Sequence, residues 1–516
     1  MSVTQTLEQT EEQTRPGGTG HVWPYGVGGG NGAAVDDGRQ HWLERLIGRY
    51  LVRRLLGWLA KGRPEGDTII ERVIYSYHNP RTPALCRLKY WPVHKVIDGI
   101  RGGASVESFQ KRISEHRPTV RGIVATMRSV AELGLSRPQR WVMPLFAVWN
   151  FTQKCNLRCR HCYQSASPER LADELDLDEK IRLIDELASH YVAMIAFAGG
   201  EPTLSADLLP VLRRCQRHGM HTSVATHGGT MSARMAADLA DAGVRYVEVS
   251  LDSVHPEKHD AFRGVPGMWQ RTVQGMRNVV AEPRLRLGVA MCVHRDNFDE
   301  VPDMLEFCER MGAGSFAHFN FIPVGRGAGM TEQDLTPAQR QQLLELLQKW
   351  MQKGTLGILS TAPQLGRVCL TDAPVDGRFT CSHAGSGSGW KARVVARYLG
   401  GCGAGRTYMC IQPNGDVTPC VYLPHRVMGN VRRTPLKRIW LHSEAWELLN
   451  DRDRRYGGCA TCKYRQYCGG CRARSDAYYG DLAGPDPGCV FNQREWEQIV
   501  RRASNGGQCE RGNVTM

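Results

Sequence analysis

Three cysteines in one short run carry the clearest chemical signal of the chain. Cys155, Cys159 and Cys162 occur in the segment NFTQKCNLRCRHCYQ with the spacing CxxxCxxC. A [4Fe–4S] cluster takes one ligand on each iron, so three protein thiolates leave one iron free to bind another molecule. A structural zinc site instead takes four ligands, often from a second CxxC pair or from histidines. The spacing therefore predicts an iron–sulfur cluster with one open coordination position.

Glycines and polar residues follow later strand-like runs, in VAMIAFAGGEP, YVEVSLDS and HFNFIPVGRG. Glycine lets a backbone approach a ligand closely. Polar side chains at the carboxyl ends of parallel strands are well placed to bind a ligand. The residues in question are Gly199, Gly200, Glu201, Ser250, Asp252 and Arg326. Each alone is ordinary turn chemistry, but together they predict a ligand site beside the three cysteines.

In this order the motifs resemble those of the radical SAM superfamily of enzymes. The resemblance implies that the free iron chelates S-adenosylmethionine (SAM) and reductively cleaves it to a 5′-deoxyadenosyl radical. It implies further that the GGE motif, with Glu201, holds the methionine amino group. It assigns Ser250 and Asp252 to the methionine carboxylate or the ribose, and Arg326 to the last strand, where backbone atoms meet the adenine.

The chain departs from the family pattern at two histidines. His227 stands in Thr226-His227-Gly228, where related enzymes usually read TNG, and His161 precedes the third cysteine, where an aromatic residue is common. A histidine that faces the cofactor could donate a proton. We expect His227 instead to replace asparagine as a hydrogen-bonding group.

A second group of cysteines lies near the carboxyl terminus. It begins as C-x12-G-x4-C and continues as CATCKYRQYCGGC. Its members are Cys402, Cys420, Cys459, Cys462, Cys468, Cys471 and Cys489. This succession resembles the SPASM extension, which carries two auxiliary iron–sulfur clusters in related enzymes.

The resemblance divides these cysteines between two auxiliary [4Fe–4S] clusters. One fully ligated cluster would use Cys459, Cys462, Cys468 and Cys489, and the other would use Cys402, Cys420 and Cys471. The fourth ligand of the second cluster stays open, with Cys410, Cys381 or an open iron as alternatives. The last pair is spaced C-x2-C where C-x3-C is commoner, which weakens this allocation.

Structural zinc is the competing interpretation of the second group, because two CxxC pairs satisfy a zinc site. The upstream CxxxCxxC favours iron–sulfur clusters. Asn414-Gly415 between β-prone runs predicts a hairpin that presents cysteines on both arms.

Composition limits the class of protein. The 516 residues predict two or three domains. The first residues lack a basic region followed by an apolar one, so we expect no secretory signal and a cytoplasmic protein. The clustered CxxC cysteines among the 18 are then metal ligands rather than disulfides, and we expect Cys509 in the C-terminal tail to be a free thiol. No apolar stretch reaches the ~18 residues of a membrane span. The net charge of +14 comes without a basic tract interleaved with aromatics, so we expect no nucleic-acid partner.

The fold expected from these patterns is α/β, a partial (β/α)6 radical SAM barrel with an N-terminal helical accessory domain and a C-terminal cysteine-rich cluster-binding domain. Strand-like and helical runs alternate through the core, which argues for parallel βαβ units. The six strand-like runs are 146–152, 194–200, 222–228, 246–252, 285–293 and 316–322.

The expected division of the chain has six parts. They are a disordered N-terminal tail (1–38), a helical accessory domain (39–144), the radical SAM core (145–330), a linker or helical region (331–398), a SPASM-like auxiliary cluster domain (399–492), and a C-terminal helix and tail (493–516).

The N-terminal region leaves two questions open. Residues 41–61 predict one helix with arginines among its apolar residues, which could pack on the next domain or lie in a membrane interface. Residues 65–140 predict helices, with Ser105 as an N-cap. They faintly resemble a winged-helix peptide-recognition domain, but the short β-sheet of that domain is not evident, and a generic helical domain is favoured.

The resemblance implies hydrogen abstraction from an unactivated C–H bond, with auxiliary clusters that could accept the electron left on the substrate. We expect an oxidative modification of a peptide; a tetrapyrrole side chain or a lipid or other small molecule are the alternatives. An electron donor such as flavodoxin or ferredoxin is implied. A non-enzymatic electron-transfer or zinc-scaffold protein is the contrasting class, and the GGEP and SLD segments argue against it because such a protein needs no SAM site.

Overall fold

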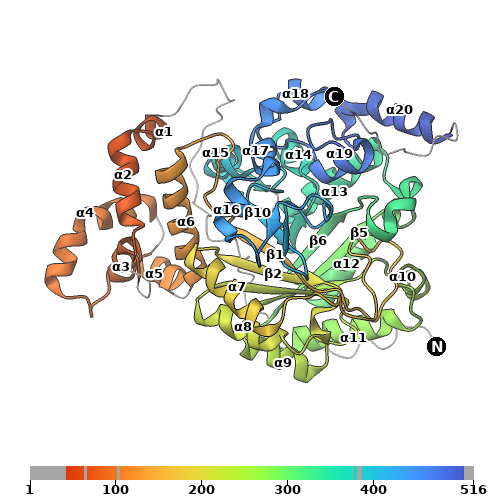
Figure 1. Ribbon diagram of the computed structural model, residues 1–516, viewed down its shortest axis with the longest axis horizontal. Coiled ribbons are helices and arrows are strands. Elements are labelled where there is room, and N and C mark those ends of the chain that lie inside the picture. The colour runs from red at the N-terminus through yellow and green to blue at the C-terminus, as the bar shows by residue number, and fades with distance from the viewer. Residues whose placement is uncertain are drawn as a thin grey trace.

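A ten-stranded sheet organises the structure, a computed structural model (Figure 1). Its strand order is β12-β11-β10-β1-β2-β3-β4-β5-β6-β7, and β10 and β1 to β7 run parallel. The structure describes residues 42–62, 67–101, 105–114, 116–372, 374, 376–380 and 386–504.

The six strands expected in the core are confirmed, each within two residues of its expected ends. They are β1 (Phe146–Thr152), β2 (Met194–Gly199), β3 (His221–Thr226), β4 (Tyr246–Ser250), β5 (Arg286–Val293) and β6 (Ser315–Asn320). Parallel neighbours place all six carboxyl ends at one edge of the sheet. The motifs that follow these strands are therefore brought to one end of the barrel.

Helices connect successive strands and cover one face of the sheet. They are α7 (Leu177–Ser189), α8 (Leu208–Arg217), α9 (Ala233–Asp241), α10 (Pro256–Arg263), α11 (Met268–Ala281) and α12 (Val301–Met311). A reciprocal capping box between Asp176 and Glu179 starts α7, which fixes where the chain turns from the cysteine loop into the first helix.

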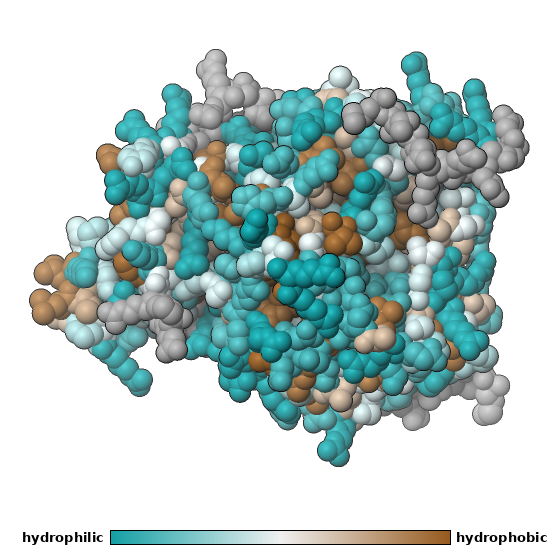
Figure 2. Space-filling view, in the orientation of Figure 1, coloured by the Kyte–Doolittle hydropathy of each residue, from teal (hydrophilic) through white to brown (hydrophobic). Residues whose placement is uncertain are grey.

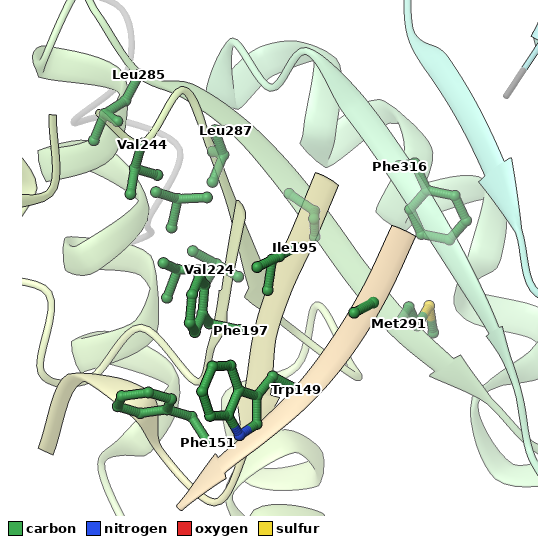
Figure 3. Packing of buried hydrophobic residues seen from close by; sticks show 14 of the residues in the cluster. Trp149, Phe151, Ile195, Phe197, Val224, Val244, Leu285, Leu287, Met291 and Phe316 are labelled. Carbon is green, nitrogen blue, oxygen red and sulfur yellow. The ribbon is translucent and has the colours of Figure 1, made fainter. Parts of the chain in front are cut away.

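Alternate residues of β1 and β2 pack against these helices as an aromatic cluster (Figure 3). Trp149 and Phe151 lie two apart on β1, and their ring centroids are 6.0 and 5.5 Å from that of Phe197 on β2. Asn150, which lies between them, points to the other side of the sheet. The cluster thus holds the strand that leads into the cysteine loop.

Residues 331–398, expected to be a linker or helical region, hold both helices and short strands. They contain α13 (Pro337–Lys353), β7 (Gly357–Ser360), α14 (Gln364–Asp372), β8 (Arg378–Thr380), β9 (Ser386–Ser388) and α15 (Gly389–Leu399). Strand β7 pairs in parallel with β6 and adds a seventh strand to the parallel series. Its four residues, GILS, are too few to show a strand period in the sequence.

The hairpin expected at Asn414-Gly415 is confirmed. Strands β10 (Tyr408–Ile411) and β11 (Asp416–Thr418) pair antiparallel, and Gly415 has a φ of +86° in the turn. Beyond the expectation, β10 also pairs in parallel with β1. The cysteine-rich part is thereby joined to the strand that precedes the three-cysteine loop.

The remaining C-terminal elements are short. They are β12 (Gly429–Asn430), α16 (Leu436–Leu441), α17 (Glu444–Asn450), α18 (Gly458–Thr461), α19 (Arg472–Tyr479) and α20 (Gln493–Ser504). Loops between them carry most of the cysteines of the second group.

Helices α1 to α6 form an N-terminal unit beside the barrel (Figure 1). They are α1 (Trp42–Ile47), α2 (Tyr50–Leu59), α3 (Ile69–Ser76), α4 (Ala84–Arg101), α5 (Val106–Ser114) and α6 (Arg117–Leu133). The single helix predicted over 41–61 is wrong in one respect: Gly48 and the extended backbone of Arg49 divide it in two. Ser105 caps α5 as expected.

The winged-helix resemblance gains no support, because no strand occurs between α1 and α6 in the part of the chain that the structure describes. The cysteines that it describes form no disulfide. Cys381, Cys509 and the tail 1–38 lie outside those residues. None of the helices described has the length and apolar content of a bilayer-spanning segment.

A buried ion pair between α7 and α8 gives a test of the barrel wall. The Lys180 ammonium is fully buried, 2.6 Å from the Asp207 carboxylate and 4.4 Å from the Phe151 ring centroid. We expect Asp207→Ala to lower the free energy of unfolding by about 3 kcal/mol because it strands a buried charge, whereas Lys180→Met removes the charge and costs less. Chemical unfolding followed by circular dichroism measures both, and an equal or larger loss in Lys180→Met would contradict the interpretation.

Candidate active site

The three-cysteine loop follows β1 directly and folds back on itself. Cys155 N donates to Ser167 O at 2.7 Å, and Cys162 N donates to Cys159 O at 3.4 Å. The three cysteines share one apolar cluster with Leu157 and Met268. Burial raises the pKa of the Cys155 thiol to about 12, with the charges of Glu201 and the neighbouring cysteines adding to the effect. The structure thus brings the three sulfurs together in a setting where a metal must displace their protons.

The predicted glycine motif lies against this loop. Gly200 N donates to Thr152 O at 2.7 Å, and Glu201 N donates to Lys154 O at 2.8 Å. A Cβ on Gly200 would lie 2.2 Å from Lys154 O, and Gly199 has a φ of +113°. Only glycine permits this approach, so the motif places the end of β2 beside the cysteines.

Glu201 is buried at the centre of a hydrogen-bond network. Its carboxylate accepts from the Thr203 hydroxyl at 2.6 Å, the Thr226 hydroxyl at 2.9 Å and the backbone N–H of His227 at 2.9 Å. These donors tie the ends of β2 and β3 together around the buried carboxylate.

His227 has the hydrogen-bonding role that we expected. Its Nδ1 accepts from Gly229 N, so Nε2 carries the proton and donates to Asn156 Oδ1 at 2.8 Å. Burial lowers the pKa of His227, which keeps the ring neutral. The ring links the cysteine loop, through Asn156, to the network of Glu201.

Asp252 meets a partner that the motif analysis did not assign. The Arg263 guanidinium lies 2.6 Å from its carboxylate and also donates to Cys159 Sγ at 3.8 Å. Burial opposes ionisation of Asp252, but Arg263, the neighbouring histidines and the backbone N–H of Cys292 together outweigh burial and lower the pKa of Asp252 to about 2. Arg263 therefore joins the predicted ligand-binding aspartate to the predicted cluster ligand.

Three rings stack over this ion pair. The His161 ring lies 4.2 Å from Phe262, and Phe262 lies 4.4 Å from His294. Burial lowers the pKa of His161 to about 3, so this ring is neutral. His161 thus supplies a flat packing surface behind the third cysteine.

Ser250 and Arg326, the other two predicted site residues, lie in different surroundings. Ser250 lies half-buried at the end of β4, in register with Ala290. Arg326 donates to Cys159 O at 2.9 Å and to Ala166 O at 2.6 Å. The structure gives Arg326 a role in closing the cysteine loop, and Gly325 beside it would clash with Cys162 O if it carried a Cβ.

Three cysteines of the second group lie around Asp486, and a fourth, Cys462, lies beside Cys459. Cys459 Sγ accepts from Asp486 N at 3.4 Å, Cys489 N donates to Asp486 O at 3.2 Å, and Cys468 Sγ accepts from Gly470 N at 3.4 Å. Burial raises the pKa of Cys468, and the charges of Cys489 and Cys459 raise it further. Cys462 interacts with Cys459 in the same way.

The other three cysteines of this group lie in a separate apolar cluster. Cys402, Cys420 and Cys471 pack together there, and the Tyr408 hydroxyl donates to Cys420 Sγ at 2.8 Å. Burial raises the pKa of Cys420 to about 12, with Cys402 and Cys410 adding to the effect. Cys410 is therefore near this set, while its sulfur accepts from Gln412 at 3.5 Å.

Two tyrosines connect the first cysteine loop to this cluster. Tyr163 follows Cys162, Tyr422 lies two residues after Cys420, and their ring centroids are 5.3 Å apart. The Tyr163 hydroxyl donates to Asn150 Oδ1 at 3.0 Å on the inner face of β1. The tyrosine pair therefore spans the space between the two cysteine sites.

These donor sets fit iron–sulfur clusters and SAM. The thiols form three groups, and the Gly199–Gly200 backbone packs directly on the segment that leads into the first of them. Among the described residues, no three His, Cys, Asp or Glu side chains converge tightly enough for one metal ion. A cubane does not need that convergence, because each thiolate binds a different iron.

Arg263, Tyr163 and Tyr422 are site residues that were not predicted from the sequence. Arg263 lies at the end of α10, and nothing in its spacing separates it from the other arginines. The tyrosines carry one usable signal, their positions one and two residues after cysteines of different groups.

Known families match two segments of the chain. A model of the radical SAM superfamily matches residues 149–308, and a model of an iron–sulfur cluster-binding domain, SPASM, matches residues 402–463. The AdoMet-dependent heme synthase of Methanosarcina barkeri is 30% identical over 349 residues, which cover 67% of this chain and 97% of that protein. The mycofactocin maturase MftC of Mycolicibacterium smegmatis is 30% identical over 351 residues, covering 67% of this chain and 83% of that protein.

A solved structure shares the fold. Streptococcus suis SuiB bound to precursor peptide SuiA has a TM-score of 0.58 and 16% identity, and the match covers 82% of this chain and 92% of that chain. The radical SAM match includes the three-cysteine loop, and the SPASM match includes Cys402, Cys420, Cys459 and Cys462 of the second group. The chain belongs to the radical SAM superfamily and is an enzyme with a SPASM domain, which implies iron–sulfur clusters and SAM as cofactors.

Proposed function

We propose that this enzyme carries out an oxidative modification of an unactivated C–H bond, and that its auxiliary region accepts the electron left on the substrate. The observation that supports it is the Tyr163–Tyr422 pair, which links the SAM-site cysteine loop to the cluster of Cys402, Cys420 and Cys471. The domain division expected from the sequence is part of this proposal.

The residues of the first site have distinct roles in this proposal. Cys155, Cys159 and Cys162 hold a [4Fe–4S] cluster, which when bound supplies the electron that cleaves SAM to the 5′-deoxyadenosyl radical. The backbone of Gly199 and Gly200, with Glu201, receives the methionine amino group.

Residues around the first site hold its geometry. Arg263 fixes the orientation of Asp252 for the ribose or carboxylate beside Ser250, and Arg326 closes the loop behind Cys159. Buried neutral His161 and His227 carry no charge into the site.

Two clusters are proposed for the auxiliary region. Cys459, Cys462, Cys468 and Cys489 bind the fully ligated one, and Cys402, Cys420 and Cys471 bind the other. Donors from Tyr408 and Gly470 to cluster sulfurs stabilise added negative charge, which suits an electron acceptor.

A peptide is the proposed substrate class, with flavodoxin or ferredoxin as the type of electron donor. The similarity to the mycofactocin maturase supports a maturase. A tetrapyrrole is the second candidate, favoured by the heme synthase, 97% of whose length this chain matches, and by the absence of a β-wing in the described N-terminal helices.

Transfer of deuterium separates the two substrates. Reduced enzyme and SAM are incubated with deuterated candidate precursor peptides encoded beside the gene, or with deuterated iron coproporphyrin III. The proposal expects deuterium in 5′-deoxyadenosine and a product lighter by two hydrogens with a peptide. The same result with the tetrapyrrole alone would replace the peptide, and a product with no net loss of hydrogen would overturn the oxidative role.

The cysteine loop is tested by Cys159→Ala. We expect 5′-deoxyadenosine formation to be abolished while iron bound by the C-terminal cysteines is retained, because the two sites fold around separate thiols. Chromatography of the nucleoside products and metal analysis measure the two effects, with Cys86→Ala on α4 as the control that keeps both. Undiminished SAM cleavage in Cys159→Ala would refute the assignment.

The role of the Gly199–Gly200 pair is tested by Gly200→Ala. The added Cβ meets Lys154 O, so the end of β2 must move away from the cysteine loop, and we expect the Kd for SAM to rise about tenfold or more at unchanged iron content. Gly329→Ala is the matched control, because a Cβ there meets no atom within 4 Å. Equal SAM affinity in the two variants, measured by calorimetry, would show that the motif does not bind SAM.

A further inference from the structure

Exposed apolar side chains concentrate on the N-terminal helices. Of sixteen large hydrophobic side chains exposed among the described residues, nine lie between residues 46 and 96. Figure 2 shows brown surface over this end of the molecule, at the positions of α1 and α2 and at the tip of α4. A monomer seldom keeps such a concentration of apolar surface without a partner.

Helix α2 has two different faces. Its inner face packs on α6, where a Cβ on Gly57 would lie 3.3 Å from Ala131 Cβ, and Leu59 is buried. Its outer face carries Leu51, Leu55 and Trp58, spaced four and three residues apart, and Leu51 is 77% exposed. Packing therefore accounts for only half of the apolar residues of this helix.

Helix α4 repeats the arrangement. Ile97 of this helix is buried, whereas its residues Leu85, Leu88 and Trp91 follow one another at three-residue intervals on the outer face. Leu85 is 82% and Leu88 is 74% exposed. Two helices separated by more than twenty residues thus both present leucines and a tryptophan outward.

The surroundings of both faces are basic. The sequence of α2 contains Arg53 and Arg54 and no acid, and α4 contains three basic side chains along its exposed turns. The one acid of α4, Asp98, accepts from the Tyr77 hydroxyl at 2.6 Å and from Lys95 at 3.4 Å.

A basic cavity of about 600 Å³ lies between α2, α6 and the barrel. Its lining includes Arg53, Arg54, Lys61, Arg128 and Lys437, and Glu132 is the one acid among the lining residues. Arg53 and Arg128 donate to backbone carbonyls and Lys437 pairs with Glu132, so exposed Arg54 and Lys61 are the lining cations that complement an anionic surface.

The position of the unit fits a docking role. Arg121 on α6 donates to Val192 O at 3.1 Å and to Ala188 O at 2.6 Å, just before β2 begins. The N-terminal helices therefore contact the amino ends of the strands, opposite the edge that carries the cysteine loop (Figure 1). A surface bound to α2 and α4 leaves the active site free.

We propose that the outer faces of α2 and α4 dock on the surface of an anionic lipid bilayer. Their leucines enter the boundary between headgroups and acyl chains, the tryptophans lie at headgroup depth, and the flanking arginines and lysines bind lipid phosphates. A second copy of the chain is a poorer occupant, because a symmetric contact would oppose two basic faces. Nucleic acid would leave the leucines uncovered.

Vesicle co-sedimentation of the full chain tests the proposal. Wild type is mixed with vesicles of phosphatidylglycerol and phosphatidylcholine, and with vesicles of phosphatidylcholine alone. We expect binding to the anionic vesicles that weakens with added salt, and little binding to the neutral ones. Equal binding to both, or to neither, would overturn the proposal.

Matched variants locate the contact. Leu51→Ser with Leu55→Ser, Leu85→Ser and Leu88→Ser should lower partitioning at least about tenfold. The control, Val280→Ser with Val427→Ser, removes exposed apolar side chains elsewhere and should bind like wild type. SAM cleavage retained in both variants shows that they are folded.

Two further results would contradict membrane docking by α2 and α4. Equal partitioning of the leucine variant and the control would show that α2 and α4 do not carry the contact. A wild-type dimer that dissociates in the leucine variant, seen by light scattering, would identify a second copy as the occupant and overturn the proposal.

Discussion

The close contact between the backbone at the end of β2 and the start of the cysteine loop is the constraint on which the site depends. Two hydrogen bonds, from Gly200 N to Thr152 O and from Glu201 N to Lys154 O, join the two segments. They lie so close that a side chain at position 200 would not fit between them. Because β1 and β2 are neighbouring parallel strands, this contact fixes the distance between the cysteines and the network of Glu201. The aromatic cluster of Trp149, Phe151 and Phe197 holds β1 and β2 in place, and it supports the site by maintaining this contact.

Buried ion pairs extend the same control to the outer parts of the site. Arg263 reaches both Asp252 and Cys159, so a change in the α10 region is transmitted to the cluster loop. At the junction with the auxiliary region, Asp334 lies 2.5 Å from Arg340 and 3.6 Å from Arg474, all three buried. Breaking such a buried ion pair costs more stability than replacing it. Because Asp334 lies just before α13 and Arg474 lies on α19, the pair joins the barrel to the auxiliary region.

Much of this site could be predicted from local sequence. Cysteine spacing, the glycine pair and the Asn414-Gly415 turn each express a local requirement of chain geometry, and the six core strands carry long β-prone runs. What could not be predicted depends on contacts between distant segments. The pairing of β10 with β1, the short strand β7 and the reach of Arg263 to Asp252 have no local period or spacing to reveal them.

We propose that the three cysteine groups bind three clusters, one of which leaves an iron open for SAM. Iron and acid-labile sulfide per chain, measured on protein purified and reconstituted without oxygen, test it most directly. We predict about twelve irons with matching sulfide, at about four irons for each cubane. About four irons together with zinc would contradict the account, because the C-terminal cysteines would then form a structural zinc site and the proposed oxidation would lack its electron acceptor.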